Sequence, residues 1–330
     1  DHRLLRQLTW DVFVVAFIPA FILAAFLPGK RRSTGIFGSF PVLNFKYWSQ
    51  ALNQVGIQSM TIVDQIFSIN SSDDFDRILS DFAWSWLPLP IRRRLGGCMA
   101  LLFVLRNGSV LHTPFSGFAF SGSSLWRLEG WLLRRARIPV VILPIGGDIY
   151  LYSRILDPSI RYGLLADYPG PGRHEGRVAK KVQYWVKHAD IVLSGLMLDG
   201  IGRWDVTTPQ YMVINTDEWK PPLSRTCHDG SSGPVTVVHC PNHRHVKGTE
   251  FIVNAVTTLC DEGLDVELLL LEGIPNDEVQ NVLQRADILV DQLVLLGYAL
   301  SAIEGLGAGL PVLANLDNDL YTQLYRRYSF

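Results

Sequence analysis

Residues 286–314 have the sequence A-D-I-L-V-D-Q-L-V-L-L-G-Y-A-L-S-A-I-E-G-L-G-A-G-L-P-V-L-A. The apolar run Ile288–Val290 predicts a buried strand, and Gly297 marks the break that follows it. A helix carrying Glu304 comes next, and a glycine-rich exit leads into a second strand at Pro311–Ala314. This order of strand, helix and strand is that of a βαβ unit in a parallel sheet. The rest of the fold is predicted around this unit.

The glycine break in this unit is a candidate phosphate site. An apolar strand that runs into a glycine and then a helix points backbone N–H groups at whatever lies above the break. The candidates to bind phosphate there are Gly297, Tyr298, Ala299 and Leu300. Glu304 is a candidate to accept hydrogen bonds from sugar hydroxyls, although the pattern also fits a plain βαβ unit with a solvated Glu304.

A second stretch supports a nucleotide site. Residues 237–250 have the sequence V-V-H-C-P-N-H-R-H-V-K-G-T-E, which predicts a strand, a polar loop and a helix that opens at Lys247-Gly248. Since the carboxyl ends of parallel strands share one edge of a sheet, we expect Lys247 and Glu304 to face the same crevice. A cation at that edge suits a diphosphate.

Together these two stretches resemble the family-4 retaining glycosyltransferases, which have the GT-B fold. The family carries a K-G after the first strand of its C-terminal domain, and Lys247-Gly248 matches it. It also carries the motif E-G-x-x-x-x-x-x-E-A-x-A-x-G-x-P-V. Its second half corresponds here to Glu304-Gly305-Leu306-Gly307-Ala308-Gly309-Leu310-Pro311-Val312, with the Glu, the Gly and the Pro-Val in place and glycine at the two Ala positions. The resemblance extends over most of the chain from Thr34 onward, and it is more specific in the C-terminal half.

The sequence departs from the family pattern at several positions. The first Glu of the motif falls on Leu296, and the family's Arg five residues before the Lys falls on Asn242. Arg244 or His243 is the candidate replacement for that Arg. Residues 145–148, I-G-G-D, resemble the family's H-G-x-D turn, but isoleucine stands in place of its His.

The resemblance implies an α/β protein of two Rossmann-like domains facing across a cleft. It implies a retaining, metal-independent glycosyltransferase that moves a sugar from a nucleotide-diphosphate sugar to a glycan or lipid-linked acceptor, without a further cofactor. Lys247, aided by Arg244 or His243, would neutralise the departing diphosphate, and such electrostatic help is often the largest catalytic effect. Asp148 and the loop 113–122 would face the acceptor; the alternative for Asp148 is a cap on the next turn.

The first predicted strand and its glycine turn lie at Thr34–Pro41, at the start of the N-terminal half. In the resembled family this turn lies beside donor and acceptor. The donor-binding residues that the resemblance implies are Glu304, Gly297, Tyr298, Ala299, Leu300, Asn242, His243, Gly38 and Ser39.

Two other hypotheses stay open. Leu296 and Ile145 are apolar where the family has polar residues, which favours a catalytically degenerate binding or scaffold protein on the same fold. A membrane-associated enzyme of another class, such as an epimerase, would need a dinucleotide in the N-terminal half, where Thr34–Pro41 lacks G-x-G-x-x-G.

Length and composition agree with a two-domain α/β protein. The chain has 330 residues, of which 48% are apolar and 18% charged. A net charge of −1 gives no indication of nucleic-acid binding, and four scattered cysteines favour reduced thiols in a cytosolic setting. The predicted parts are an apolar helix at 1–33, an N-terminal acceptor domain at 34–218, a linker at 219–233, and a nucleotide-sugar-binding domain at 234–330 that we expect to be incomplete.

Two segments of the N-terminal half and one histidine cluster carry further expectations. We expect Leu151–Gly172 to be irregular and Tyr211–Asp217 to form the last strand of the first domain. No metal site is expected, because the spacing of the cluster fits no zinc pattern. The cluster consists of His239, Cys240, His243 and His245.

The N-terminus predicts a contact with a membrane or with the protein core. Residues 12–27 are uninterruptedly apolar, and these sixteen residues of helix would span about 24 Å, short of a ~30 Å hydrocarbon core. Lys30-Arg31-Arg32 follows, which would keep the catalytic part on the cytoplasmic face if the segment is an anchor. The alternative is a helix packed on the protein. Residues 84–105, with two Trp and three consecutive Arg, fit either a surface on anionic lipid or a core helix with a solvated basic end.

Overall fold

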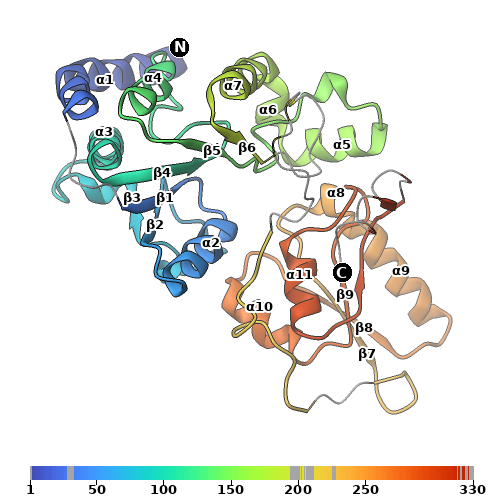
Figure 1. The fold of residues 1–330 in the computed structure, drawn as a ribbon. Coiled ribbons are helices and arrows are strands. Elements are labelled where there is room, and N and C mark those ends of the chain that lie inside the picture. Colours follow the sequence, from blue (N-terminus) through green and yellow to red (C-terminus); the bar gives the residue numbers. More distant parts are fainter. Residues whose placement is uncertain are drawn as a thin grey trace. The chain divides into compact units, whose positions relative to one another are not determined.

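The computed structural model describes residues 2–27, 33–193, 212–224 and 228–317, together with 201, 203, 205, 319, 322, 323 and 326. The chain divides into two compact units, each with its own parallel sheet (Figure 1). Unit 1 comprises Asp1–Phe67, Ser72–Tyr150 and His174–Thr207. Unit 2 comprises Ser68–Ser71, Leu151–Arg173 and Thr208–Phe330. The predicted α/β class with an apolar N-terminal helix is confirmed.

The sheet of unit 1 has six strands in the order β3-β2-β1-β4-β5-β6, and all neighbouring pairs are parallel. This is the order of a doubly wound Rossmann sheet, in which ligands bind outside the carboxyl ends of the two strands where the order reverses. Those strands are β1 and β4. The strands are β1 Thr34–Ser39, β2 Ser59–Val63, β3 Arg77–Ile78, β4 Gly108–Thr113, β5 Val140–Ile142 and β6 Ile191–Val192.

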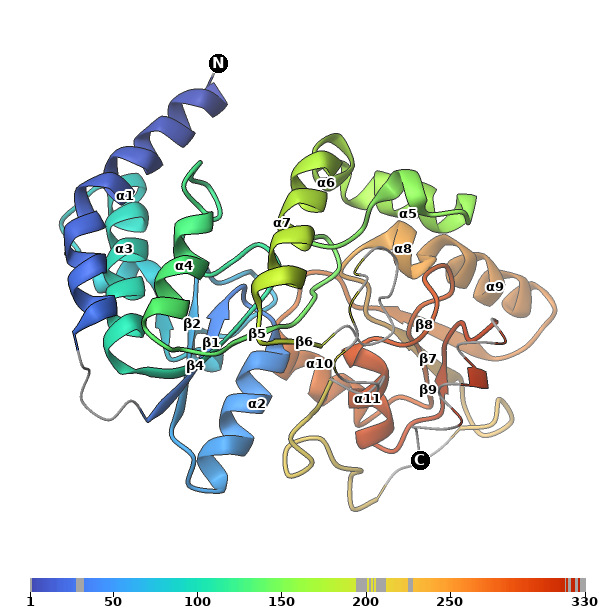
Figure 2. The ribbon, with the colours of Figure 1, turned by 45° about the horizontal axis from the view of Figure 1, so that its top comes forward.

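Helices cover both faces of this sheet, as expected where strands are connected by right-handed crossovers. The core between them is apolar, with Ile36, Leu101, Leu111, Phe118 and Trp185 almost fully buried. The helices are α1 His2–Phe26, α2 Leu43–Gln54, α3 Leu89–Asn107, α4 Arg127–Arg135 and α7 Glu175–His188, with short 3₁₀ turns η1 Ser72–Asp74 and η2 Leu79–Phe82. Helix α1 lies beside α3 and α4 in both views (Figures 1 and 2).

The sheet of unit 2 has four parallel strands in the order β10-β9-β7-β8. Its order reverses between β7 and β9, so the carboxyl ends of these two strands form the switch point. The strands are β7 Val235–His239, β8 Val266–Leu270, β9 Ile288–Val290 and β10 Val312–Leu313. The helices are α5 Pro158–Asp167, α6 Pro169–Arg173, α8 Arg244–Lys247, α9 Thr249–Asp261, α10 Asn276–Leu283 and α11 Leu300–Gly307, with a 3₁₀ turn η3 Tyr152–Arg154.

The segment predicted to be irregular, Leu151–Gly172, is instead largely helical. The Asp157 carboxylate accepts hydrogen bonds from the N–H groups of Ser159 and Ile160, which caps α5, and Pro158 occupies its first turn. The segment lies in unit 2, whereas the predicted N-terminal domain, 34–218, includes it. The reason is contact with α8, where Gly163 of α5 lies against the His245 backbone.

The strand predicted at Tyr211–Asp217 is absent from the part of it that is described. Residues 212–215 have no regular structure, and the Asn215 side chain accepts a hydrogen bond from Asp217 N–H in a turn. Tyr211 and the basic residues 30–32 lie outside the described residues.

Candidate functional site

Lys247 lies at the end of α8, directly beyond the carboxyl end of β7. The next residue, Gly248, has φ +75°, and a side chain there would come within 3.2 Å of Leu293. This left-handed residue ends α8 and begins α9, which turns the Lys247 side chain into the protein. Lys247 is 7% exposed, and its Nζ lies 2.5 Å from Asp291 Oδ1.

Asp291 follows β9 immediately and is buried. Besides Lys247, its Oδ1 accepts a hydrogen bond from Ser301 Oγ at 2.7 Å, and its Oδ2 accepts one from Ala299 N–H at 2.7 Å. Ala299 is the residue before α11, and Ser301 is in its first turn. A carboxylate of the protein itself thus occupies the N-terminus of α11, a position that favours anions. Sequence reasoning missed Asp291, although its place directly after a buried strand was the available signal.

In the loop expected to bind phosphate, two backbone N–H groups already donate hydrogen bonds to other groups of the protein. Ala299 N–H binds Asp291, and Gly297 N–H donates to the Asn315 carbonyl at 2.8 Å. Gly297 has φ +86°, so the glycine break is present as predicted. A phosphate role for Gly297, Tyr298, Ala299 and Leu300 stays a prediction.

Glu304 lies in the middle of α11 and is 3% exposed, so the alternative of a solvated Glu304 is wrong. It accepts a hydrogen bond from Asn276 Nδ2 at 3.1 Å. Burial, together with the charges of Glu304 and Asp291, raises the pKa of the Cys240 thiol to about 12 against the opposing charge of Lys247. Lys247 and Glu304 are connected through Asp291, which binds both Lys247 and Ser301, one turn before Glu304 on α11. That the two side chains face one crevice stays a prediction.

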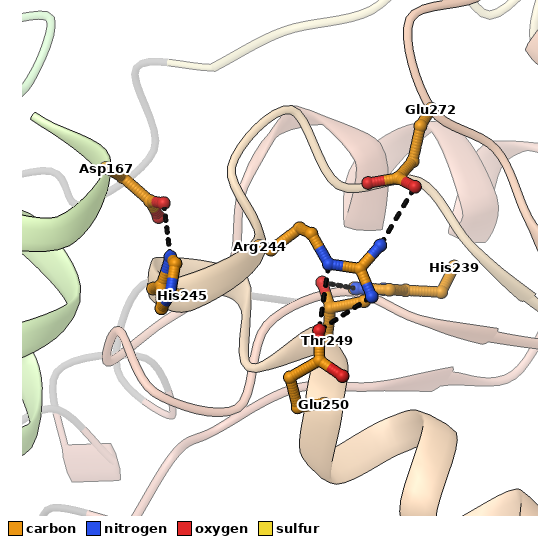
Figure 3. A network of polar contacts seen from close by, with 7 residues as sticks. All are labelled: Asp167, His239, Arg244, His245, Thr249, Glu250 and Glu272. Carbon is orange, nitrogen blue, oxygen red and sulfur yellow. Dashed lines mark hydrogen bonds and ion pairs between the residues drawn. The ribbon is translucent and has the colours of Figure 1, made fainter.

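A buried histidine, His239, connects β7 to β9 and to the start of α9; Figure 3 shows its contact with Thr249. His239 Nδ1 lies 2.8 Å from the Val290 carbonyl, which only accepts, so Nδ1 carries the proton. Its Nε2, 2.9 Å from Thr249 Oγ1, then accepts from that hydroxyl. Burial lowers the pKa of His239, in agreement with a neutral ring. His239 thereby holds β7, β9 and the start of α9 together.

Arg244, a candidate to neutralise the diphosphate, is engaged with two carboxylates instead (Figure 3). Its Nε and one terminal nitrogen bind Glu250 at 2.9 and 2.7 Å, and the other terminal nitrogen binds Glu272 at 2.9 Å. Hydrogen bonds to Glu250 and Glu272 raise the pKa of Arg244. A ligand would have to displace both partners before Arg244 could bind it.

The other candidates in this loop lie nearer to solvent. His243 packs against the Tyr168 ring, with centroids 4.1 Å apart, and burial lowers its pKa. Asn242 is exposed in the connection between β7 and α8. His245 Nδ1 contacts Asp167 at 2.8 Å, and Asp167 also accepts from Val246 N–H (Figure 3). These contacts attach α5 to the loop.

In unit 1, half-buried Asp148 accepts backbone hydrogen bonds. Its carboxylate binds the N–H groups of Ile145 at 2.9 Å and Phe115 at 2.8 Å. Burial raises the pKa of Asp148 to about 6, against the opposing effects of these hydrogen bonds and of the Lys181 charge. Asp148 thus holds the turn after β5 and the loop after β4, which is closer to the capping alternative than to an acceptor contact.

The loop 113–122 is further held by Glu129, which sequence reasoning missed. Buried Glu129 accepts hydrogen bonds from three successive N–H groups, at 2.6, 2.7 and 3.0 Å, and burial raises its pKa. The donors are Phe118, Ala119 and Phe120. Lys181 donates to the carbonyls of Ser116 and Ser121, and burial lowers the pKa of Lys181 to about 8. Two charged side chains therefore fix the conformation of this loop.

Gly38 and Ser39 lie at the carboxyl end of β1, the switch point of unit 1. A Cβ at Gly38 would come within 2.1 Å of the Ile62 carbonyl oxygen, so only glycine fits there. Ser39 Oγ donates to the Gly117 carbonyl at 3.4 Å. In the described part of the chain, two buried oxygens at the ends of β2 and β4, Asp64 Oδ1 and Thr113 Oγ1, have no hydrogen-bond partner.

Metal-binding side chains do not cluster in the part of the chain that the structure describes: it contains no group of three or more His, Cys, Asp or Glu placed to hold an ion. Both ring nitrogens of His239 are already in hydrogen bonds.

Comparison with known proteins adds little to this geometry. No protein-family model and no curated protein matches the chain. Among solved structures, the crystal structure of the glycotransferase of kitacinnamycin is 13% identical, with a TM-score of 0.37 and an alignment over 90% of this chain and 85% of that chain. A TM-score this low establishes neither a family nor a function. The fold itself defines the class, an α/β protein of two parallel-sheet units, each with polar side chains at its switch point.

Proposed function

We propose that the protein is a retaining glycosyltransferase that moves a sugar from a nucleotide-diphosphate sugar to a glycan or lipid-linked acceptor at the cytoplasmic face of a membrane. The observation that carries the proposal is that Asp291, at the carboxyl end of β9, links buried Lys247 beyond β7 to the first turn of α11, the helix that carries buried Glu304. In doubly wound sheets this is the position at which nucleotides bind.

In this mechanism Lys247 supplies the positive charge that a metal supplies in other transferases, so the reaction proceeds without a metal. As the bond between sugar and diphosphate breaks, negative charge grows on the diphosphate oxygens, and the Lys247 ammonium and the N-terminus of α11 stabilise it. Glu304 binds the ribose hydroxyls. Asp291 is the positioning residue, because it keeps the ammonium and the start of α11 together before the donor arrives.

Unit 1 binds the acceptor in this proposal. Its loop 113–122 follows β4 at the switch point, and the contacts to Glu129, Lys181 and Asp148 preorganise it. A preorganised wall reduces the conformational entropy lost when an acceptor binds.

One observation favours the second candidate, a degenerate binding or scaffold protein without turnover. Asp291 already satisfies the ammonium of Lys247, the N–H of Ala299 and the hydroxyl of Ser301. Those are the donors that a diphosphate would use. If these donors stay bound to Asp291 when a nucleotide is present, the nucleotide binds weakly and no sugar is transferred.

The test measures two quantities, heat stabilisation by nucleoside diphosphates and sugar transfer from a panel of nucleotide sugars. Lys247→Ala and Glu304→Ala are each compared with Lys187→Ala and Glu262→Ala, which remove exposed residues of the same type. The transferase proposal expects the rate of sugar transfer to fall at least about tenfold in the site variants only. Heat stabilisation by nucleoside diphosphates should weaken in the same variants. Stabilisation without transfer by the wild type supports the scaffold, and unchanged rates in both site variants exclude the proposed site.

A further inference from the structure

Helix α1 is attached to unit 1 by one face. Val14, Phe21, Ala24 and Ala25 are buried, and their spacing of seven, three and one follows a single stripe of a helix. The Phe21 ring packs on Phe120 with centroids 5.4 Å apart. This stripe faces α3 and α4 (Figure 2).

Polar contacts fasten the same helix near its middle. The Asp11 carboxylate accepts hydrogen bonds from Ser123 Oγ at 2.6 Å, Ser124 Oγ at 2.7 Å and Ser124 N–H at 2.8 Å. The Trp10 ring lies so close to the chain that a Cβ at Gly122 would be 2.9 Å from its Nε1. A helix that crossed a bilayer would have to break these contacts or carry Ser123 and Ser124 into hydrocarbon, which is costly.

The opposite face of α1 is apolar and uncovered. Leu8, Val12, Val15, Leu23 and Phe26 are each more than half exposed. Residues 12–27 contain no charged side chain on any face. By length and composition α1 is the one helix of the described residues that could cross a membrane. A helix that is apolar all round is normally covered on all sides, by protein or by lipid, and a continuous apolar surface of this kind marks an interaction site.

Aromatic and basic side chains flank this face at its C-terminal end. The Phe26 and Trp131 rings have centroids 6.3 Å apart, and the Arg135 guanidinium lies 5.0 Å from the Phe26 ring and 6.0 Å from that of Trp131. Trp131, Arg134 and Arg135 are exposed on α4. Tryptophan prefers the boundary between headgroups and acyl chains, and arginine there attracts anionic headgroups.

We infer that α1 lies in the plane of an anionic phospholipid bilayer. Its exposed apolar face is buried at the headgroup–acyl boundary, with Trp131 and Arg135 at the edge of the contact and unit 1 attached on the other side. Unit 1 provides the polar side that an interfacial helix otherwise has on its own surface. This inference goes beyond the proposed sugar transfer, and its tests measure no transfer.

The first test measures binding of the full chain to vesicles of phosphatidylcholine with and without phosphatidylglycerol. Binding is expected only with phosphatidylglycerol, and it should weaken with salt. Val15→Ser and Leu23→Ser should each weaken it about tenfold. Leu156→Ser and Leu223→Ser, which remove exposed leucines of unit 2, serve as matched controls and should have no effect. Absent binding, or equal binding by all variants, overturns the inference.

A second test distinguishes a helix in the membrane plane from one that crosses it. Spin labels at Leu8, Val15 and Ile22, one at a time in a chain with Cys227, Cys240 and Cys260 changed to serine, lie seven residues apart on one side of α1. An in-plane helix places all three labels at one depth, whereas a spanning helix places Val15 deepest, which would overturn the inference. A dimer in solution that Leu23→Ser dissociates, without vesicle binding, would assign the face to a second copy instead.

Discussion

Lys247 Nζ lies 2.5 Å from Asp291 Oδ1, although 44 positions separate the two residues in the sequence. One follows β7 and the other follows β9, and these strands are neighbours only because the sheet reverses its order between them. The pair couples a buried cation to the N-terminus of α11, where Ala299 N–H and Ser301 Oγ bind the same carboxylate. The candidate donor site of unit 2 is built on this pair.

The first prediction concerns this ion pair. Asp291→Asn should reduce the free energy of unfolding by about 3–5 kcal/mol, since a buried ammonium without a partner is costly. Asp291→Asn combined with Lys247→Met should recover most of the loss, because no unpaired charge remains. Urea unfolding of both variants measures this. If the double variant is as unstable as the single one, the loss does not come from the charge of Lys247.

The second prediction concerns the loop 113–122. Glu129→Gln should destabilise unit 1 by about 2–3 kcal/mol, because one charged acceptor of three hydrogen bonds becomes a neutral group with a single acceptor oxygen. Hydrogen exchange of the Phe118, Ala119 and Phe120 amides should accelerate. Glu262→Gln, at an exposed position, is the control. Unchanged exchange at these amides would show that Glu129 does not hold the loop.

The third prediction concerns pH. Burial raises the pKa of Asp64 from 3.8 to about 6, so the folded protein keeps a proton that the unfolded chain releases. Its contribution to stability is therefore lost as pH rises from 3.8 to about 6. Asp64→Asn should remove that loss. The free energy of unfolding of the variant, relative to that of the wild type, should therefore be higher at pH 7 than at low pH. Urea unfolding of wild type and Asp64→Asn at both ends of this range measures the effect, and a difference that stays constant with pH would contradict it.

The fourth prediction concerns the first glycine turn. Gly38→Ala should lower the free energy of unfolding by about 1–3 kcal/mol, because the new methyl group would overlap the Ile62 carbonyl oxygen. Gly35→Ala in the same strand should be tolerated, since its nearest neighbour would be 3.6 Å away. Thermal unfolding of the two variants measures the difference. Equal stability would mean that β1 can move away from β2 at Gly38.

Local structure of unit 2 could be predicted well because each element has a clear period or break. The strand Ile288–Val290 forms with the predicted bounds, and within 237–250 the predicted strand ends at His239 and the predicted helix begins at Thr249. The helix α5 was missed because its segment is rich in Tyr and Pro, although Asp157-Pro158 is a capping signal. The assignment of that segment to unit 2 depends on contacts with α8, which no local pattern encodes.

Sequence alone was enough to obtain the α/β class and the strand–helix–strand unit of residues 286–314. It also placed Lys247 after a strand and Glu304 in a helix. These properties follow from hydrophobic period, glycine breaks and the geometry of parallel strands, all of which act over a few residues. Which groups pair depends on the tertiary structure: Asp291 binds Lys247, Glu250 and Glu272 bind Arg244, and Glu129 binds backbone N–H groups of the loop 113–122. The tertiary structure also decided that α1 covers unit 1 with one face, because side-chain pairing depends on which strands and helices become neighbours, and that is a property of the whole chain.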